Sequence, residues 1–336
     1  MLFATHAAYL EHLVDPGHVE RPARLGAVLD GVRAAGLDGA VVPIEPVAAD
    51  ADDLARVHTT EHLERVRGVC VAGGGRLDPD TPVSEGSWRA ALLAAGAGLT
   101  AVRELRAGRG AAAFCAVRPP GHHATANEAM GFCLVNNVAV VAARLADEGE
   151  RVMVVDYDVH HGNGTQAIFA QDPRVLFVSL HGWPLYPGSG RHVEVGEGAA
   201  RGTTMNVPLP HGATGDVVLY AFDQLIAPLA ERFAPTWVLV SAGFDGHRDD
   251  PIGALGLSSA DYGPLTRRIL GLVPPGRRLV MLEGGYDLDA LRVCTSVVVR
   301  EMAGASTVPV EEPTSGGPGH GSVRRVHEHW SVEGLW

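Results

Sequence analysis

Short apolar runs alternate with longer amphipathic segments through about the first 300 residues of the chain. Runs such as 152–155 and 237–241 are rich in β-branched residues and lack polar alternation, which predicts strands buried on both faces of a parallel sheet. Longer segments such as 87–107 repeat apolar residues at helical spacing. We therefore expect an α/β domain with a mainly parallel central sheet and helices on both faces. The expected strands are 111–116, 152–155, 175–180, 204–207, 237–241 and 279–282, and the expected helices are 22–35, 51–67, 87–107, 134–148, 216–232, 258–272 and 288–301.

A single domain is expected over residues 1–305, because no internal repeat and no Pro/Gly-rich linker interrupts the alternation. The composition changes near Ser306. Residues 306–336 form a C-terminal tail that contains Pro, Gly, His and Ser and includes Trp330 and Trp336. This tail is either flexible or packed back on the domain through its tryptophans, and we expect partial order.

Polar side chains that can bind a metal follow two of the expected strands. Asp156, Asp158 and His160 occupy alternate positions after the first strand, so in an extended chain they line one side. Asp245 follows the second strand, and ligand sites of parallel sheets collect outside the carboxyl ends of the strands. Asp158, His160 and Asp245 supply three N/O ligands and leave one coordination position open, which is typical of a catalytic zinc site.

Two further motifs follow expected strands. The turn 118–123 ends in His122 and His123, and paired imidazoles suit general acid–base work near neutral pH. An isolated pair of this kind is more often a hydrogen-bonded surface feature, but the neighbouring metal cluster favours catalysis. The Gly284-Gly285-Tyr286 turn could aim a phenol at a metal-bound carbonyl, although an ordinary Gly-rich turn is the simpler interpretation.

Composition and charge narrow the function classes. The chain has 336 residues, 46% of them hydrophobic, and a net charge of −12, which argues against a nucleic-acid-binding protein held by a basic surface. All 27 basic residues are arginine, so lysine-based catalysis is excluded, and the bias toward Ala, Gly and Arg suggests a GC-rich genome. Four scattered cysteines fit buried free thiols. We expect a cytoplasmic protein without a membrane span, and a homo-oligomer is compatible with the sequence.

Taken together, the motifs resemble the zinc-dependent histone deacetylase superfamily, most closely its bacterial, class II-like members and the related acetylpolyamine amidohydrolases. The resemblance extends from about residue 20 to about residue 302 and implies the arginase–deacetylase fold, a single α/β domain. The matching stretches are RPPGHHA at 118–124, GFCLVNN at 131–137, VVDYDVHHGNGTQ at 154–166, LYPGSG at 185–190, SAGFDGHRDDP at 241–251 and LEGGY at 282–286.

The resemblance also implies catalytic roles. His122 and His123 would activate water and deliver protons, and Tyr286 would polarise the scissile carbonyl. Asp156 would orient His122. Asn163 stands where class I enzymes place an aspartate partner for the second histidine, which makes His123 less strongly held as an imidazolium.

Ion and substrate contacts follow from the same resemblance. One zinc ion per chain would be bound by Asp158, His160 and Asp245. A structural potassium ion would be held by Asp156, Asp158, His160, Ser179 and Leu180, and a second monovalent cation by Phe169, Asp172 and Val175. The substrate channel would be lined by Phe132, Tyr186, Gly131 and Ile252, with Asp80 as a carboxylate at its rim; core packing is the alternative interpretation of the aromatic residues.

The implied reaction is hydrolysis of an N-acyl amide by metal-activated water, with acyl-lysine in peptides or proteins as the expected substrate. Acetylpolyamines or other small acetylated amines are the alternative. Ile252 stands where polyamine-selective members carry a glutamate, which favours acetyl-lysine mildly. More remote alternatives are a dimanganese ureohydrolase of the same fold and a non-catalytic acyl-lysine binder.

Overall fold

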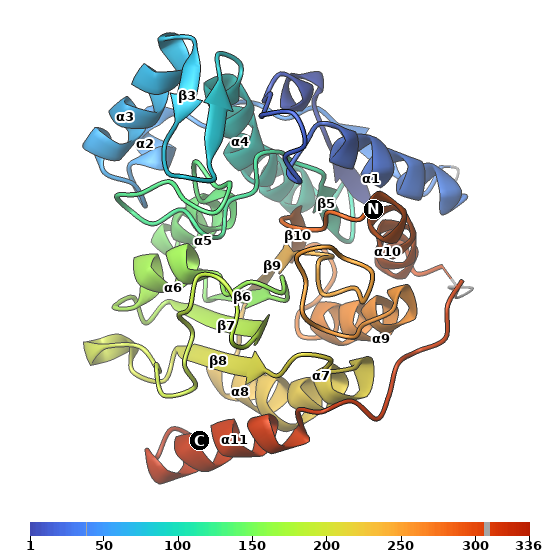
Figure 1. Cartoon of the computed structure of the whole chain (residues 1–336). Helices are drawn as coiled ribbons and strands as arrows, with labels where there is room; N and C mark the ends of the chain where they lie inside the picture. Colours follow the sequence, from blue (N-terminus) through green and yellow to red (C-terminus); the bar gives the residue numbers. More distant parts are fainter. Residues whose placement is uncertain (38, 306–309) are drawn as a thin grey trace.

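The computed structural model describes residues 1–37, 39–305 and 310–336 (Figure 1). Its centre is an eight-stranded sheet in the order β2-β1-β5-β10-β9-β6-β7-β8, and every neighbouring pair is parallel. The expected α/β domain with a mainly parallel sheet is confirmed. The strands are β1 (Leu2–Ala4), β2 (Val42–Ile44), β5 (Ala113–Cys115), β6 (Val152–Asp156), β7 (Val175–Gly182), β8 (Thr204–Leu209), β9 (Trp237–Ala242) and β10 (Arg278–Leu282), and a separate hairpin pairs β3 (Gly74–Arg76) with β4 (Pro82–Ser84).

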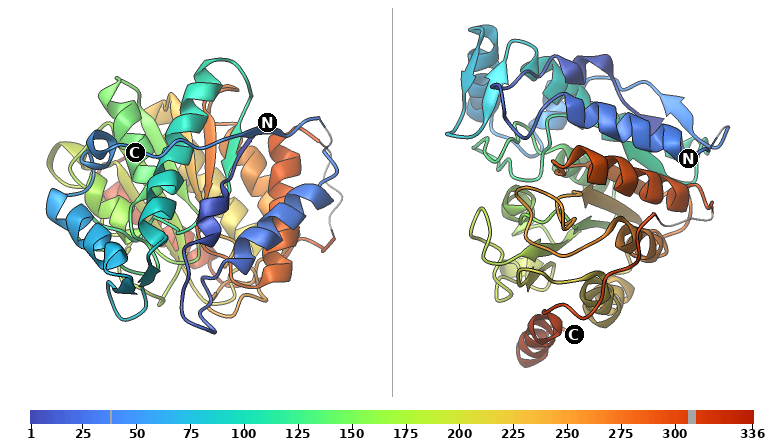
Figure 2. Two further views of the ribbon diagram at one scale, coloured as in Figure 1. Left: turned by 90° about the horizontal axis from the view of Figure 1, so that it is seen from above. Right: turned by 45° about the vertical axis from the view of Figure 1, so that its right-hand side comes forward.

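Helices cover both faces of the sheet (Figure 2). Two of them, α4 and α5, pack on the strands of one face, and α1, α10 and α9 pack on one another over the opposite face. None of the described helices is both long and apolar enough to cross a membrane. The helices are α1 (Ala23–Ala34), α2 (Ala51–Leu54), α3 (Thr60–Val71), α4 (Ser87–Arg106), α5 (Asn137–Asp147), α6 (Asn163–Phe169), α7 (Gly215–Ala221), α8 (Ala227–Phe233), α9 (Ser259–Leu270), α10 (Leu288–Met302) and α11 (His320–Val332).

Two expected helices are interrupted. The helix expected at 51–67 is divided into α2 and α3, because Thr59 is extended and its side chain accepts a hydrogen bond from His62 N at 3.3 Å, which starts a new helix. The helix expected at 216–232 contains a π-helical turn, Phe222–Ile226, between α7 and α8. Strands β1 and β2 were not expected, since three residues are too few to show a strand pattern.

The strand order explains why distant motifs meet. The neighbouring strands β5, β10, β9 and β6 occupy the middle of the sheet and end at the same edge. The register aligns Asp156 at the end of β6 with Ser241 of β9 and Ser179 of β7. The loops that follow these four central strands therefore emerge side by side, and they carry the His122–His123 pair, the 156–160 cluster, Asp245 and the Tyr286 turn.

The C-terminal segment packs back on the domain. In α11, the side chains of Val323, Val326 and Trp330 are buried, and the helix contacts β8 and α7. Before it, Thr314 donates a hydrogen bond to Asp261 at 2.7 Å. Residues 306–309, where we expect the tail to begin, lie outside the described residues, so the division at 305/306 stays a prediction.

Candidate active site

The three expected zinc ligands converge in the structure. His160 Nδ1 lies 3.1 Å from Asp158 Oδ1 and 3.2 Å from Asp245 Oδ2. Ligands placed about 2.0–2.1 Å from a tetrahedral zinc ion are separated from one another by about 3.3 Å. The donor set and its spacing therefore fit a zinc ion, and Asp158 and Asp245 are fully buried.

Backbone groups fix the orientation of both carboxylates. Asp158 accepts hydrogen bonds from His160 N at 2.9 Å and Gly284 N at 2.8 Å, and Asp245 accepts one from Val159 N at 2.9 Å. A Cβ atom at position 284 would overlap the Asp245 carboxylate, so this position requires glycine. The first glycine of the Gly-Gly-Tyr turn thus lets the backbone that follows β10 approach the ligands.

Asp158 and Asp245 are buried close to each other, so their like charges destabilise the folded protein unless a cation binds between them. Burial, and then the charge of Asp158, raises the pKa of Asp245 to about 7. Burial alone would lower the pKa of His160, but its hydrogen bonds to Asp158 and Asp245 raise it to about 10. A divalent cation among these three donors would offset the repulsion between the two carboxylates, which is a second reason why the residues fit a metal.

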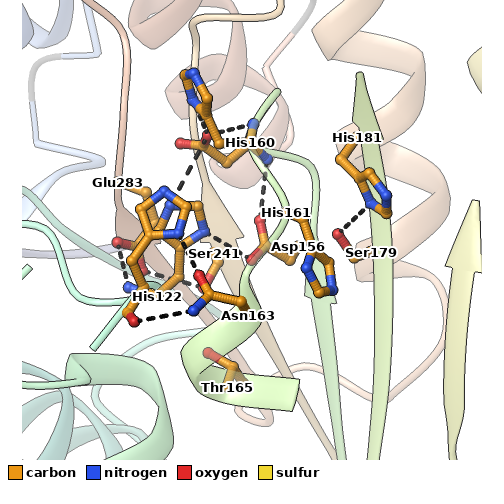
Figure 3. Close-up of polar contacts among 12 residues, drawn as sticks. His122, Asp156, His160, His161, Asn163, Thr165, Ser179, His181, Ser241 and Glu283 are labelled. Carbon is orange, nitrogen blue, oxygen red and sulfur yellow. Dashed lines mark hydrogen bonds and ion pairs between the residues drawn. The ribbon is translucent and has the colours of Figure 1, made fainter. Parts of the chain in front are cut away.

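The two histidines of the pair have different partners, and Figure 3 labels His122 together with Asp156 and Asn163. His122 Nδ1 lies 2.9 Å from Asp156 Oδ2, and His123 Nδ1 lies 2.7 Å from Asn163 Oδ1. Both oxygens are acceptors, so each Nδ1 carries a proton, and each Nε2 is left for substrate or water. The ring centroids lie 4.0 Å apart, which places the two imidazoles beside one another.

The different surroundings of His122 and His123 shift the pKa values of the two histidines in opposite directions. Burial alone would lower the pKa of His122, but the charges of Asp156 and Asp158 raise it to about 10. Burial, and then the positive charges of His122 and His160, lowers the pKa of His123 well below its usual value. Near neutral pH the pair therefore contains one imidazolium and one neutral imidazole, which is the combination that an acid and a base require.

Replacing Asn163 with aspartate should raise the pKa of His123, because a carboxylate would then accept its Nδ1–H. If His123 must be neutral to accept a proton, the acidic limb of the kcat/KM–pH profile should move to higher pH, and activity at pH about 6 should fall. Bound zinc should be measured at each pH as a control for metal loss. An unchanged acidic limb would exclude His123 as the base.

The Tyr286 turn places a phenol near the carboxylate ligands Asp158 and Asp245. The Tyr286 side chain is nearly buried, and its ring centroid lies 5.8 Å from that of Phe132. Burial raises the pKa of Tyr286 well above its usual value, so the hydroxyl stays protonated and can donate a hydrogen bond. Asp250 holds the turn by accepting a hydrogen bond from Tyr286 N at 2.7 Å.

Aromatic side chains surround this cluster. The Tyr186 ring centroid lies 5.2 Å from that of His123, and a Cβ atom at Gly131 would lie 2.5 Å from the His123 ring. Phe132 has a left-handed backbone with φ of 71°, and its N–H donates to Thr81 at 3.1 Å, next to the exposed Asp80. Ile252 is brought beside the Tyr286 turn because its N–H also donates to Asp250, at 3.1 Å.

The residues expected at the first potassium site also lie together. Ser179 pairs with Asp156 across β7 and β6, and its Oγ lies 2.9 Å from His181 Nδ1. His181 Nε2 lies 3.0 Å from the carbonyl oxygen of Gly190, which can only accept, so Nδ1 is the unprotonated atom. The Ser179 hydroxyl therefore donates to His181, and its oxygen lone pairs are left for a cation.

The second expected cation site lies in the turn between α6 and β7. Asp172 N donates to the Phe169 carbonyl at 3.0 Å, and Val175 N donates to the Asp172 carbonyl at 3.3 Å. The Asp172 side chain pairs with Arg174 instead. Any monovalent cation here would depend on backbone carbonyls.

Sequence reasoning missed four buried charged residues that support the site. Glu283 Oε2 accepts hydrogen bonds from Gly121 N at 2.6 Å and His122 N at 3.1 Å, which fixes the histidine turn. Its place in the Leu282–Tyr286 motif was the available clue. The other three form a network of Glu20, Arg24 and Arg118, in which Arg24 donates to the carbonyls of Gly285 and Glu283 at 2.6 Å each.

Replacing Glu20 with glutamine should lower the free energy of unfolding by about 3–5 kcal/mol, because two fully buried guanidinium groups would lose their charge partner. Urea denaturation at pH 7 would measure the change. Glu11→Gln is the control, since its pair with Arg89 is exposed and should contribute less than about 1 kcal/mol. Equal effects of the two variants would contradict the structural role of the network.

Comparison with known proteins agrees with this geometry. Residues 18–302 match the family model of the histone deacetylase domain. The chain belongs to the histone deacetylase family. It is 38% identical to a probable deacetylase of Archaeoglobus fulgidus over 92% of this chain and 88% of that protein. It is 37% identical to the histone deacetylase-like amidohydrolase of Pseudomonas aeruginosa over 88% of this chain and 80% of that protein.

The structural comparison shows the fold directly. The crystal structure of the HDA15 HD domain covers 99% of this chain, and this chain covers 93% of it, with a TM-score of 0.89 and 36% identity. The expected arginase–deacetylase fold is therefore confirmed. As a member of this family, the chain is an amidohydrolase of the deacetylase type, and the family is generally zinc-dependent.

Proposed function

We propose that this deacetylase hydrolyses the Nε-acyl amide of lysine in peptides or proteins, with one zinc ion held by Asp158, His160 and Asp245. The observation that carries the proposal is the combination of three buried donors with a histidine pair whose Nδ1 atoms are held by Asp156 and Asn163. Zinc would supply Lewis acidity at the carbonyl and lower the pKa of a bound water. Potassium, at the sites of Ser179 and of the Phe169–Val175 turn, would have a structural role.

Different side chains carry out the separate proton transfers of the reaction. Neutral His123 accepts the water proton at Nε2, since its Nδ1–H is held by Asn163. Protonated His122, held by Asp156, stabilises negative charge on the tetrahedral intermediate and can supply a proton to the leaving amine. The Tyr286 hydroxyl donates to the developing oxyanion.

The residues around the histidine pair and the Tyr286 turn favour a substrate with an apolar side-chain stem, such as acyl-lysine. The Tyr186 ring packs against His123 and the Phe132 ring packs against Tyr286, and both aromatic rings would contact the methylene groups of a lysine side chain. Ile252, beside the Tyr286 turn, provides no carboxylate for a second ammonium group. A small acetylated amine is the second candidate, because the rim carboxylate Asp80 could pair with a distal ammonium group.

Competition between an acetyl-lysine peptide and acetylspermidine would test the substrate class. We expect the zinc-loaded enzyme to have the higher kcat/KM for the peptide. Ile252→Glu should raise kcat/KM for acetylspermidine by about tenfold, the effect expected of one favourable charge pair. Preference of the unmodified enzyme for acetylspermidine would replace the lysine proposal with polyamine deacetylation.

A further inference from the structure

A cavity of about 420 Å³ lies between α11 and the loop that follows β7. Figure 1 shows α11 next to β8, at the edge of the sheet. The volume is within the range of sites that hold small organic ligands. The lining residues are Trp183, Arg191 and His192 from the loop, Pro208 and Pro210 from β8 and the turn after it, and Ser322 and Arg325 from α11.

One stripe of α11 anchors the helix and a neighbouring stripe faces the cavity. Val323, Val326 and Trp330 form the buried stripe. Ser322 and Arg325 directly precede Val323 and Val326 in the helix, and both line the cavity. The C-terminal helix is thus attached in a way that completes one wall of the cavity.

The cavity wall is positively charged although the chain is acidic overall. Among the described residues, Arg191 and Arg325 form no ion pair, and the Arg325 guanidinium donates only to Ser322 Oγ, at 2.8 Å. Burial, and then the positive charges of His329, Arg325 and Arg191, lowers the pKa of His192. The first turn of α11 contains no acidic residue, so the positive end of its dipole is not offset by a carboxylate there.

One polar atom next to the cavity is unsatisfied. The His329 ring packs against that of His192 with centroids 5.7 Å apart. His329 Nε2 is buried and has no hydrogen-bond partner among the described residues. Buried polar atoms are normally paired in folded proteins, so His329 Nε2 is an unused hydrogen-bonding atom behind the lining residue His192.

We propose that this cavity binds a small organic anion, a phosphate or a carboxylate carried on a flat apolar group. Arg191 and Arg325 would pair with the anion, since guanidinium groups suit the planar, bidentate recognition of both acids. The Trp183 ring with Pro208 and Pro210 would pack on the flat group. The proposal concerns a site other than the zinc site and does not depend on the substrate of the enzyme.

The same loop connects the cavity with the candidate active site. Trp183 and Arg191 lie near the two ends of the segment that carries Tyr186, whose ring packs against His123. A ligand in contact with both ends would restrain this segment. Binding should therefore slow amide hydrogen exchange in residues 183–192.

Calorimetric titration of the full chain with phenyl phosphate, benzoate, phenol and inorganic phosphate would test the proposal. We expect phenyl phosphate or benzoate to bind, with the stronger of the two identifying the acid, and phenol and inorganic phosphate to bind at least about tenfold more weakly. Arg325→Gln should weaken binding by about tenfold or more. Arg324→Gln is the matched control, because the neighbouring Arg324 faces Tyr220 and Gln224 instead.

Several results would overturn the proposal. One is the absence of binding by both aromatic acids at millimolar concentration. Another is an equal loss in Arg324→Gln and Arg325→Gln, which would indicate attraction to diffuse surface charge. Because a change in helix packing could also reduce affinity, Trp183→Ala should weaken phenyl phosphate more than inorganic phosphate, and the ligand should protect residues 183–192 from exchange; failure of either would also contradict the site.

Discussion

Replacing Asp245 with asparagine is expected to abolish stable zinc binding and to reduce amide hydrolysis to background. The variant keeps an oxygen that can accept the hydrogen bond from Val159 N, so the local backbone should be retained. It removes one of the two carboxylate ligands, and a neutral amide oxygen is a much weaker zinc ligand. Bound metal after dialysis and turnover of an acetyl-lysine peptide would be measured on the same preparation.

Asp249 provides the matched control for this variant. It lies four residues later in the same loop, and its side chain is 64% exposed beside His247. Asp249→Asn should leave zinc content and turnover unchanged. If Asp249→Asn lost the metal and Asp245→Asn retained it, the catalytic metal would belong to the His247, Asp249 and Glu311 group instead.

The folding stability of the metal-free protein should also depend on the protonation of Asp245. The pKa of Asp245 in the folded protein is raised to about 7, so the folded state holds this proton more tightly than the unfolded state does. Through this group, stability should fall as pH rises from about 4 to about 7. The fall should be absent in Asp245→Asn and smaller when zinc is bound.

Replacing Tyr286 with phenylalanine should lower kcat by about two to three orders of magnitude, the usual effect of losing one donor to an oxyanion. The ring would keep its packing against Phe132 and the Arg24 guanidinium, whose central carbon lies 4.8 Å from the ring centroid. Zinc content and the free energy of unfolding should therefore be unchanged. Steady-state kinetics with an acetyl-lysine peptide would measure the loss.

Tyr262→Phe controls for removal of a phenol near the site. The Tyr262 hydroxyl is buried without a partner among the described residues, and its ring packs against Phe244. This variant should keep full activity. Wild-type turnover in Tyr286→Phe would show that the phenol does not stabilise the transition state.

The sequence was most informative where local pattern and chemistry coincide. The apolar runs 152–155 and 237–240 end shortly before Asp156 and Asp245, so the meeting of these side chains follows from parallel strand ends. The family resemblance added Asn163 and favoured the catalytic role of Tyr286 over an ordinary Gly-rich turn, because no spacing rule specifies the positions of these two side chains in space. The variants described above test the roles proposed for them.

Other features depend on contacts that the sequence does not encode locally. Glu20 and Arg118 are separated by 98 positions and are both fully buried, although charged residues are usually exposed. Strand β1 has only three residues and owes its place to β2 and β5 on either side. Helix α11 has just three buried apolar anchors in a polar segment, so its helical pattern was too weak to predict.

Titration of metal-free protein with zinc, with bound metal and acetyl-lysine peptide turnover measured at each point, tests the central claim most directly. We predict that turnover rises in proportion to bound zinc and reaches its plateau at one equivalent per chain, with no rise in Asp245→Asn. A plateau that requires two equivalents, or no peptide turnover at full zinc occupancy, would contradict a mononuclear zinc lysine deacylase.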